Sequence, residues 1–349
     1  MTRSLKSILI VTLLGLAPAS FAADPDIERF ATEFLALCPG TGISQKPWTE
    51  TLPQGLTGTI IELEADQPWC GGQYLAVRTA NGKLFLGHPW LLRGRKGSTE
   101  EKIRAFAWDN LQQNLTVEPG GTRSPEGLSR VSAFETTEYG RVPMVGLVDA
   151  TGTIFFPGYF YSIGNPAKER LDLAREVIAT APMRGAAGSD VLVLEFSDFQ
   201  CPSCKRVSPV VKELIEAYGE RIEYRRIDLP IFGMHPWALP ASVIGRAIHR
   251  QSPEAFWAYK DAVYENQAEL NTFVIEDFAF GFAEGQSLDL EKLRGDLAAG
   301  EIRSEILKAV GIASDLQVRG TPTFWVNGRP VDFGEDGEGL KATIDAALK

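Results

Sequence analysis

The stretch Val191-Leu-Val-Leu-Glu-Phe-Ser-Asp-Phe-Gln-Cys-Pro-Ser-Cys204 is an apolar run followed at once by two cysteines three positions apart. The apolar run predicts a buried strand, and the sequence after Cys201 predicts a helix. Pro202 suits the first position of that helix, because its missing N–H would have no helical partner there. We therefore expect Cys201 at the N-cap of a helix that directly follows a strand.

This position favours redox chemistry. The unpaired N–H groups and the positive dipole end of a helix stabilise an anion, so they lower the pKa of a thiol placed there. The thiolate is the nucleophile in disulfide exchange. Cys204 lies on the same side of the first turn, where it is placed to resolve a mixed disulfide. The sequence therefore predicts a dithiol/disulfide centre at Cys201 and Cys204, with no cofactor beyond the cysteine pair.

Two other uses of the pair stay open. In the first, the chain is a chaperone or binding protein and the pair is only a structural disulfide. In the second, the two thiolates handle copper. A zinc site usually needs four N or S ligands, whereas this chain has a single Cys-x-x-Cys pair, four cysteines and three histidines in all. The sequence therefore predicts no metal site, and four methionines are few for a copper protein.

Residues 1–22 have the layout of a secretory signal peptide. Arg3 and Lys6 precede an apolar run, and small residues lead up to a cleavage site near Ala22. We expect an exported chain, soluble in the periplasm after cleavage, where disulfide chemistry is permitted. The net charge of −10, without a Lys/Arg cluster, argues against nucleic acid or an anionic lipid surface as a partner.

The chain has room for two domains. Residues 181–190 are small and flexible, and we interpret them as a linker between an N-terminal domain, residues 23–180, and a C-terminal domain, residues 191–349. The C-terminal pattern is strand, helix and strand, then a helical insertion at about 237–316, then a hairpin turning at Asn327-Gly328 and a last helix. This order implies a parallel strand pair with an antiparallel addition.

The N-terminal domain reads as mixed α and β. Asn81-Gly82 predicts a tight hairpin turn, and Ser98 with Glu101 predicts a capping box that opens a helix. Cys38 and Cys70 are predicted to form a structural disulfide; free or separately paired thiols and a second redox pair are the alternatives. The role of this domain is not apparent from any motif.

The segments "VLEFSDFQCPSC" (193–204) and "GTPTFWVNG" (320–328) together resemble the thioredoxin superfamily, specifically its DsbA-like branch. The resemblance covers residues 191–349. It implies an α/β thioredoxin fold with an inserted helical subdomain, preceded here by a separate mixed α+β N-terminal domain. It also implies a thiol–disulfide oxidoreductase whose direction of exchange is open. Its partners would be cysteine-containing exported proteins and a membrane redox partner for recycling.

The resemblance assigns roles to further residues. Pro322 corresponds to a cis-proline packed against the disulfide, and Thr321 before it offers backbone groups that hold a client chain. Pro202 and Ser203, between the cysteines, also belong to the substrate-binding surface. Glu195 corresponds to a buried acid that exchanges a proton with the second cysteine.

Two features set this chain apart from DsbA itself. DsbA carries a histidine between its cysteines, whereas Pro202-Ser203 supplies no cation, so we expect a less oxidising pair. Exported isomerases of the superfamily also carry an N-terminal domain that dimerises and holds clients. By analogy alone, residues 23–180 are expected to serve client binding or homodimer formation.

Overall fold

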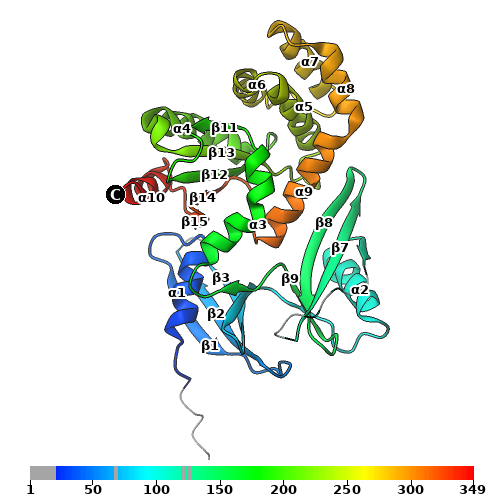
Figure 1. Cartoon of the computed structure of the whole chain (residues 1–349), viewed down its shortest axis with the longest axis vertical. Coiled ribbons are helices and arrows are strands. Elements are labelled where there is room, and N and C mark those ends of the chain that lie inside the picture. The colour runs from blue at the N-terminus through cyan, green and yellow to red at the C-terminus, as the bar shows by residue number, and fades with distance from the viewer. Residues whose placement is uncertain (1–20, 67–69, 119–120, 122, 124–126) are drawn as a thin grey trace, which may run out of the picture.

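The computed structural model describes residues 21–66, 70–118, 121, 123 and 127–349. The expected signal peptide therefore lies almost wholly outside the described residues. Within these ranges the strands form three five-stranded sheets, two in the N-terminal region and one in the C-terminal region (Figure 1). No helix of this described part has both the length and the apolar character that a membrane crossing needs.

The first sheet is antiparallel throughout and lies next to helix α1, Pro25–Phe34. Its strands, in spatial order, are β1 (Gly42–Pro47), β2 (Leu56–Glu64), β3 (Gly72–Thr79), β4 (Lys83–Gly87) and β10 (Tyr161–Ser162). The turn predicted at Asn81-Gly82 is confirmed, because it joins β3 to β4 with Gly82 at a φ of 82°. Such a positive φ is readily adopted by glycine.

The second sheet is also antiparallel. Its strands, in spatial order, are β5 (Trp90–Leu91), β9 (Ile154–Pro157), β8 (Gly140–Val148), β7 (Ser129–Thr137) and β6 (Leu115–Val117). Helix α2, Thr99–Leu111, begins after Ser98, whose side chain and that of Glu101 form the predicted capping box. Helix α3, Pro166–Thr180, then leads into the C-terminal region.

The third sheet has the mixed topology that the sequence predicts. Its spatial order is β11 (Met183–Gly185), β13 (Glu223–Asp228), β12 (Leu192–Ser197), β14 (Thr323–Val326) and β15 (Arg329–Val331). β12 and β13 are parallel and are joined through α4 (Pro202–Tyr218) and a short 3-10 turn (Gly219–Arg221), while the other pairs are antiparallel. This arrangement confirms the thioredoxin-type fold.

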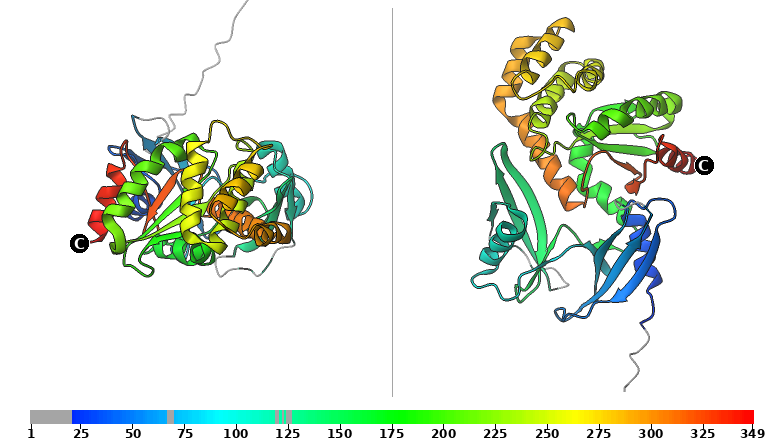
Figure 2. Two further views of the ribbon diagram at one scale, coloured as in Figure 1. Left: turned by 90° about the horizontal axis from the view of Figure 1, so that it is seen from above. Right: turned by 180° about the vertical axis from the view of Figure 1, so that it is seen from behind.

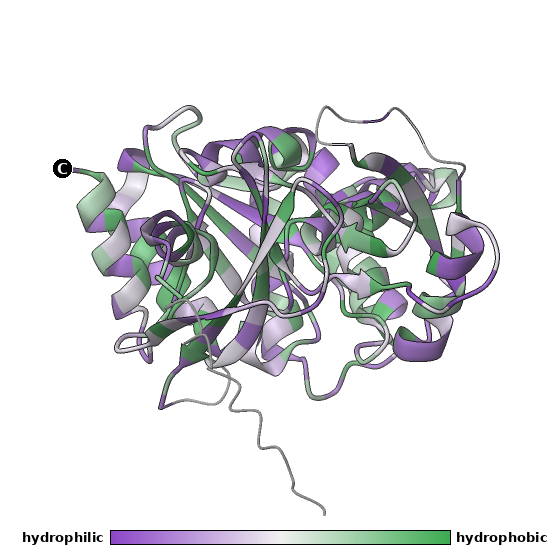
Figure 3. Cartoon of the chain, turned by 90° about the horizontal axis from the view of Figure 1, so that it is seen from below, coloured by the Kyte–Doolittle hydropathy of each residue, from purple (hydrophilic) through white to green (hydrophobic). Residues whose placement is uncertain are grey.

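The predicted helical insertion is confirmed as five helices between β13 and β14. These are α5 (Ala238–Gln251), α6 (Pro253–Glu265), α7 (Ile275–Gly285), α8 (Leu290–Ala299) and α9 (Glu301–Asp315). The last helix, α10 (Glu338–Ala347), buries Leu340 and Ile344 and leaves other residues in solvent. Its ribbon accordingly carries both hydrophilic and hydrophobic residues (Figure 3), as expected for a helix that packs by one side.

One sequence-based interpretation needs correction. Residues 181–190 do not form a free linker, because they include β11, which pairs with the edge of β13. Gly185, which ends β11, has a φ of 80°, and a side chain there would overlap the Ile222 carbonyl. At Gly185 the small residue therefore permits close packing of two backbone segments and does not indicate flexibility.

The N-terminal region is packed firmly against the C-terminal region. The hairpin of β7 and β8 lies beside α9 (Figures 1 and 2). At this contact Gly311 of α9 approaches the Pro143 carbonyl so closely that any side chain would overlap it. The Asp315 carboxyl, at the end of α9, accepts a hydrogen bond of 3.1 Å from the Val145 N–H. Both contacts require the two regions to hold a fixed relative position.

The predicted bond between Cys38 and Cys70 is present, with the two Cα atoms 5.8 Å apart. It links the segment after α1 to the segment before β3.

We expect replacement of both Cys38 and Cys70 by alanine to lower the free energy of unfolding by about 3–4 kcal/mol, the chain-entropy value for a loop of this length. Urea unfolding followed by tryptophan fluorescence would measure the loss. An unchanged unfolding midpoint in the double variant would show that the bond does not stabilise the fold. The variant should keep its Cys201–Cys204 chemistry.

Candidate functional site

Cys201 is the N-cap residue of α4, and Pro202 occupies the first helical turn, as predicted. Cys201 and Cys204 form no disulfide in this structure, and both are buried. The Cys201 thiol donates a hydrogen bond of 3.3 Å to the carbonyl oxygen of Thr321. The fold therefore brings together the two motifs that the sequence singled out.

The two thiols differ strongly in acidity. The pKa of Cys201 is lowered to about 5, and the largest cause is a hydrogen bond from the Cys204 side chain. The Thr321 side chain and the N–H groups of Cys204 and Ser203 lower this pKa further, whereas burial raises it. Burial, followed by the nearby Cys201 and Glu195, raises the pKa of Cys204 well above its usual value. Cys201 is thus the thiolate near neutral pH, and Cys204 keeps its proton.

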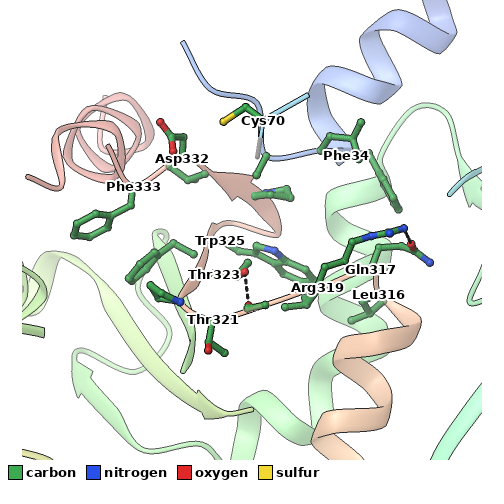
Figure 4. A pocket seen from close by; sticks show the side chains of 18 of the residues that line it. Phe34, Cys70, Leu316, Gln317, Arg319, Thr321, Thr323, Trp325, Asp332 and Phe333 are labelled. Atoms are coloured by element: carbon green, nitrogen blue, oxygen red, sulfur yellow. Dashed lines mark hydrogen bonds between the residues drawn. The ribbon is translucent and has the colours of Figure 1, made fainter. Parts of the chain in front are cut away.

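Thr321 and Pro322 follow α9 and lie at the start of β14, joined by a cis peptide bond. The Thr323 hydroxyl donates to the Gly320 carbonyl at 2.8 Å, which closes the loop around them (Figure 4). The expected cis geometry is confirmed. The expectation that these residues hold a client chain remains a prediction.

Glu195 lies in the middle of β12 and is only 5% exposed, so the expected burial is observed. Its carboxylate accepts a hydrogen bond from the Tyr224 hydroxyl on the neighbouring strand β13. Its charge is close enough to raise the pKa of Cys204. The expectation that Glu195 exchanges a proton with this thiol remains a prediction.

Asp198 is a site residue that sequence reasoning missed. One of its carboxylate oxygens accepts hydrogen bonds from the N–H groups of Gln200 at 2.7 Å and Cys201 at 3.2 Å. The other accepts from the Ile231 N–H at 2.7 Å and lies 2.8 Å from Nδ1 of His235. Asp198 therefore fixes the backbone that presents Cys201. An aspartate just before a helix start is a common turn former, and this was the available signal.

Arg226 was also missed. It is fully buried on β13, pairs with Asp228 and lies with its guanidinium carbon 4.1 Å from the centre of the Phe199 ring. Its Nη2 donates to the Tyr264 hydroxyl at 3.4 Å. The sequence does not reveal this buried charge pair. Two consecutive arginines in a strand normally indicate a solvent-exposed edge, because arginine is seldom fully buried.

Within the described residues, no group of three or more His, Cys, Asp or Glu side chains is arranged to hold a metal ion.

A pocket of about 520 Å³ begins at Thr321 and Pro322 and extends between the C-terminal and N-terminal regions (Figure 4). Thr321, Thr323, Trp325 and Phe333 line it from the C-terminal side, and the Cys38–Cys70 disulfide lines it from the N-terminal side. The cleft next to the reactive thiol is therefore built by both halves of the chain.

Residues 178–346 match the family model described as thioredoxin. This match covers the third sheet, its helical insertion and both halves of the site.

Curated relatives match the same half of the chain. One is the Na(+)/H(+) antiporter NhaA 1 of Salinispora arenicola, 34% identical over 166 residues, which are 48% of this chain and 24% of that protein. Another is the probable disulfide bond formation protein D of Bacillus cereus, 29% identical over 197 residues, which are 54% of this chain and 88% of that protein. The chain spans about a quarter of the length of the antiporter relatives.

Among solved structures, the chain is similar to the thiol-disulfide exchange protein alpha-DsbA2 of Wolbachia pipientis. That match has a TM-score of 0.44 and 22% identity, and it covers 52% of this chain and 96% of the other. Oxidised BdbD of Bacillus subtilis matches with a TM-score of 0.43 and 22% identity over 49% of this chain and 94% of the other.

We expect the rate of Cys201 alkylation by iodoacetamide in the reduced protein to rise with pH through a midpoint of about 5 and then level off, since only the thiolate reacts. Mass spectrometry of acid-quenched samples would measure it. In a Cys204→Ala variant the midpoint should move up, because the hydrogen bond from the Cys204 side chain that stabilises the Cys201 anion is gone. A wild-type midpoint near the ordinary thiol value of about 8.5 would contradict the proposed activation.

Proposed function

We propose that this chain, in which residues 178–346 form a thioredoxin-fold domain of the DsbA-like family, is an exported thiol–disulfide oxidoreductase acting on proteins. The observation that carries the proposal is the Cys201 thiol at the start of α4, with its lowered pKa and its contact to the Thr321 carbonyl. A structural disulfide would have no need of such activation.

The exchange proceeds in two displacement steps. When the pair is oxidised, a client thiolate attacks Cys201 Sγ, forms a mixed disulfide and releases Cys204 as a thiolate, which takes up a proton. A second client thiolate then attacks its own cysteine in the mixed disulfide and releases Cys201. The client has lost two electrons, and the Cys201–Cys204 pair has gained them; Cys204 ends protonated, Cys201 ends as a thiolate, and the other client proton passes to solvent.

The protein groups have distinct parts in these steps. The low pKa of Cys201 makes it the better leaving group in the second step. Glu195, buried near Cys204, relays a proton from water to Cys204 when that residue leaves as a thiolate, and the Tyr224 hydroxyl holds the Glu195 carboxyl in position. Thr321 and Pro322 hold the client backbone, with Pro202 and Ser203 forming the opposite rim.

We further propose that the net direction is donation of disulfides to clients in the periplasm. The relative from Bacillus cereus is named as a probable disulfide bond formation protein, which supports this direction. The pKa of about 5 for Cys201 also supports it, since a stable thiolate favours the reduced form of the pair. Donation requires a membrane redox partner that reoxidises the pair. The N-terminal region assists client binding.

We expect that a Cys201→Ser variant will not catalyse the oxidative refolding of reduced, unfolded ribonuclease. The reason is that the sulfur atom that forms the mixed disulfide with the client is gone. Recovered ribonuclease activity over time measures this. The matched control is the double alanine variant at Cys38 and Cys70, which should retain the activity. Full activity in Cys201→Ser would instead favour a chaperone that acts without thiol chemistry.

We expect the reduction potential of the Cys201–Cys204 pair to lie between that of DsbA, about −120 mV, and that of thioredoxin, about −270 mV. The reason is that the Cys201 pKa of about 5 lies between the values of about 3.5 and about 7 for those two proteins. Titration against glutathione buffers, with alkylation of free thiols, measures the potential. A value at or below that of thioredoxin would rule out disulfide donation.

A further inference from the structure

The pocket beside Thr321 carries positive charge in a chain that is acidic overall. The chain has a net charge of −10. The charged residues that line the pocket are Arg170, Arg319 and Asp332, two cations and one anion. Asp332 lies beside Phe333, away from the side on which Arg319 and Gln317 lie (Figure 4). The net charge of the residues that line the pocket is therefore positive, whereas the net charge of the whole chain is negative.

Arg319 is the accessible cation, two residues before Thr321. Its Nη2 donates to Oε1 of Gln317 at 2.7 Å and to Nδ1 of His88 at 2.9 Å. His88 Nε2 in turn lies 2.9 Å from the Gln73 carbonyl, so Nε2 carries the ring proton and Nδ1 is the acceptor. In the part of the chain that the structure describes, no carboxylate forms an ion pair with Arg319, so two neutral partners orient its charge, Gln317 from its own segment and His88 from the N-terminal region.

Arg170 is the buried cation. It is 1% exposed, and its guanidinium carbon lies 3.7 Å from the Phe34 ring centre and 5.1 Å from that of Trp325. Its Nη2 donates to the Phe34 carbonyl at 2.6 Å, whereas its Nε and Nη1 have no hydrogen-bond partner among the described residues. A buried cation without a carboxylate is costly, and its field is weakly screened. It therefore adds to the positive potential inside the pocket.

The position of the pocket links this charge to the client. A client cysteine bonded to Cys201 lies next to Thr321, whose carbonyl contacts the Cys201 sulfur. Arg319 is two residues from Thr321, so the two Cα atoms are at most about 7 Å apart. A client residue about two positions from the cysteine spans the same length along its own chain, which brings it within range of the Arg319 side chain. Tyr74, a half-buried ring at the pocket wall whose centre lies 5.7 Å from the Arg319 guanidinium carbon, is able to cover the apolar part of that residue.

We propose that the pocket selects clients that carry an acidic residue within about two positions of the reacting cysteine, and that Arg319 pairs with its carboxylate. This inference rests on the proposed function and names its substrate class. The selectivity is a joint property of the two halves of the chain, because His88 of the N-terminal region fixes the Arg319 side chain that the C-terminal region supplies.

The test uses the full chain with its Cys201–Cys204 pair oxidised. Blocked five-residue peptides with a central cysteine and alanine elsewhere carry Glu or Gln two positions before, or two positions after, the cysteine. The rate of peptide consumption is followed by acid quench and mass spectrometry, at equal concentrations of peptide thiolate. We expect one of the two Glu peptides to react about fivefold faster than its Gln counterpart at low salt, the size of a good exposed ion pair, and less so at high salt.

Variants locate the effect. Arg319→Gln should abolish the preference, and Arg319→Lys, which keeps the charge, should retain part of it. The matched control is Arg303→Gln, because Arg303 is an exposed arginine on α9 that does not line the pocket; this variant should keep the full preference. Alkylation of Cys201 at an unchanged rate in each variant would show an intact thiol site.

Two results would overturn the inference alone. These are equal rates for the Glu and Gln peptides in the wild-type protein, and a preference that survives Arg319→Gln. A wild-type protein that reacts with none of the peptides and with no reduced protein client would overturn the proposed function as well.

Discussion

The contact between the Cys201 sulfur and the Thr321 carbonyl is the interaction on which the site depends. These residues are 120 positions apart, and they meet only because β12 and β14 are neighbours in the sheet. β12 delivers the start of α4, and β14 follows the Thr321-Pro322 loop directly. The Cys201 sulfur, the N–H groups of a helix end and the Thr321 carbonyl thus converge at one point.

Buried polar groups next to the reactive thiol support the loop that carries Cys201. Asp198 joins the backbone at Cys201 to the segment that precedes α5, and Arg226 pairs with Asp228 beneath the Phe199 ring. Such groups are costly to bury unless they are bonded to one another. Because Asp198 bonds to the N–H groups of both Cys201 and Ile231, it holds the loop before α4 against the segment before α5. The reactive thiol can then have a fixed environment and a shifted pKa.

The N-terminal region contributes shape and charge to the neighbourhood of the site. It is held in place by the packing of β8 on α9, where only Gly311 permits the close approach, and by Arg170 between Phe34 and Trp325. Its first sheet thereby forms a wall of the pocket that opens at Thr321. A thioredoxin domain without this region would keep the thiol chemistry and lose that wall.

The sequence by itself determined the fold class of the C-terminal half, both cysteines of the centre, the cis bond at Pro322, the burial of Glu195 and the helical insertion. The helix start at Pro202, the apolar strand before it and the Asn-Gly turns follow from local rules, because they depend on neighbouring residues. The cis bond at Pro322 and the burial of Glu195 were expected because the sequence resembles the DsbA-like family. The Cys38–Cys70 pairing was also expected, although spacing alone did not compel it.

Only the tertiary structure decided what depends on contacts between distant segments. The apparent linker at 181–190 is partly a strand, because its small residues allow close packing that composition does not distinguish from flexibility. The contacts that Asp198 makes to Ile231 and His235, and the contact that orients Arg319 at His88, have no signature in the chain itself. The physical reason is that hydrogen bonds and charge pairing at long sequence separation arise from the assembled fold and not from local preference.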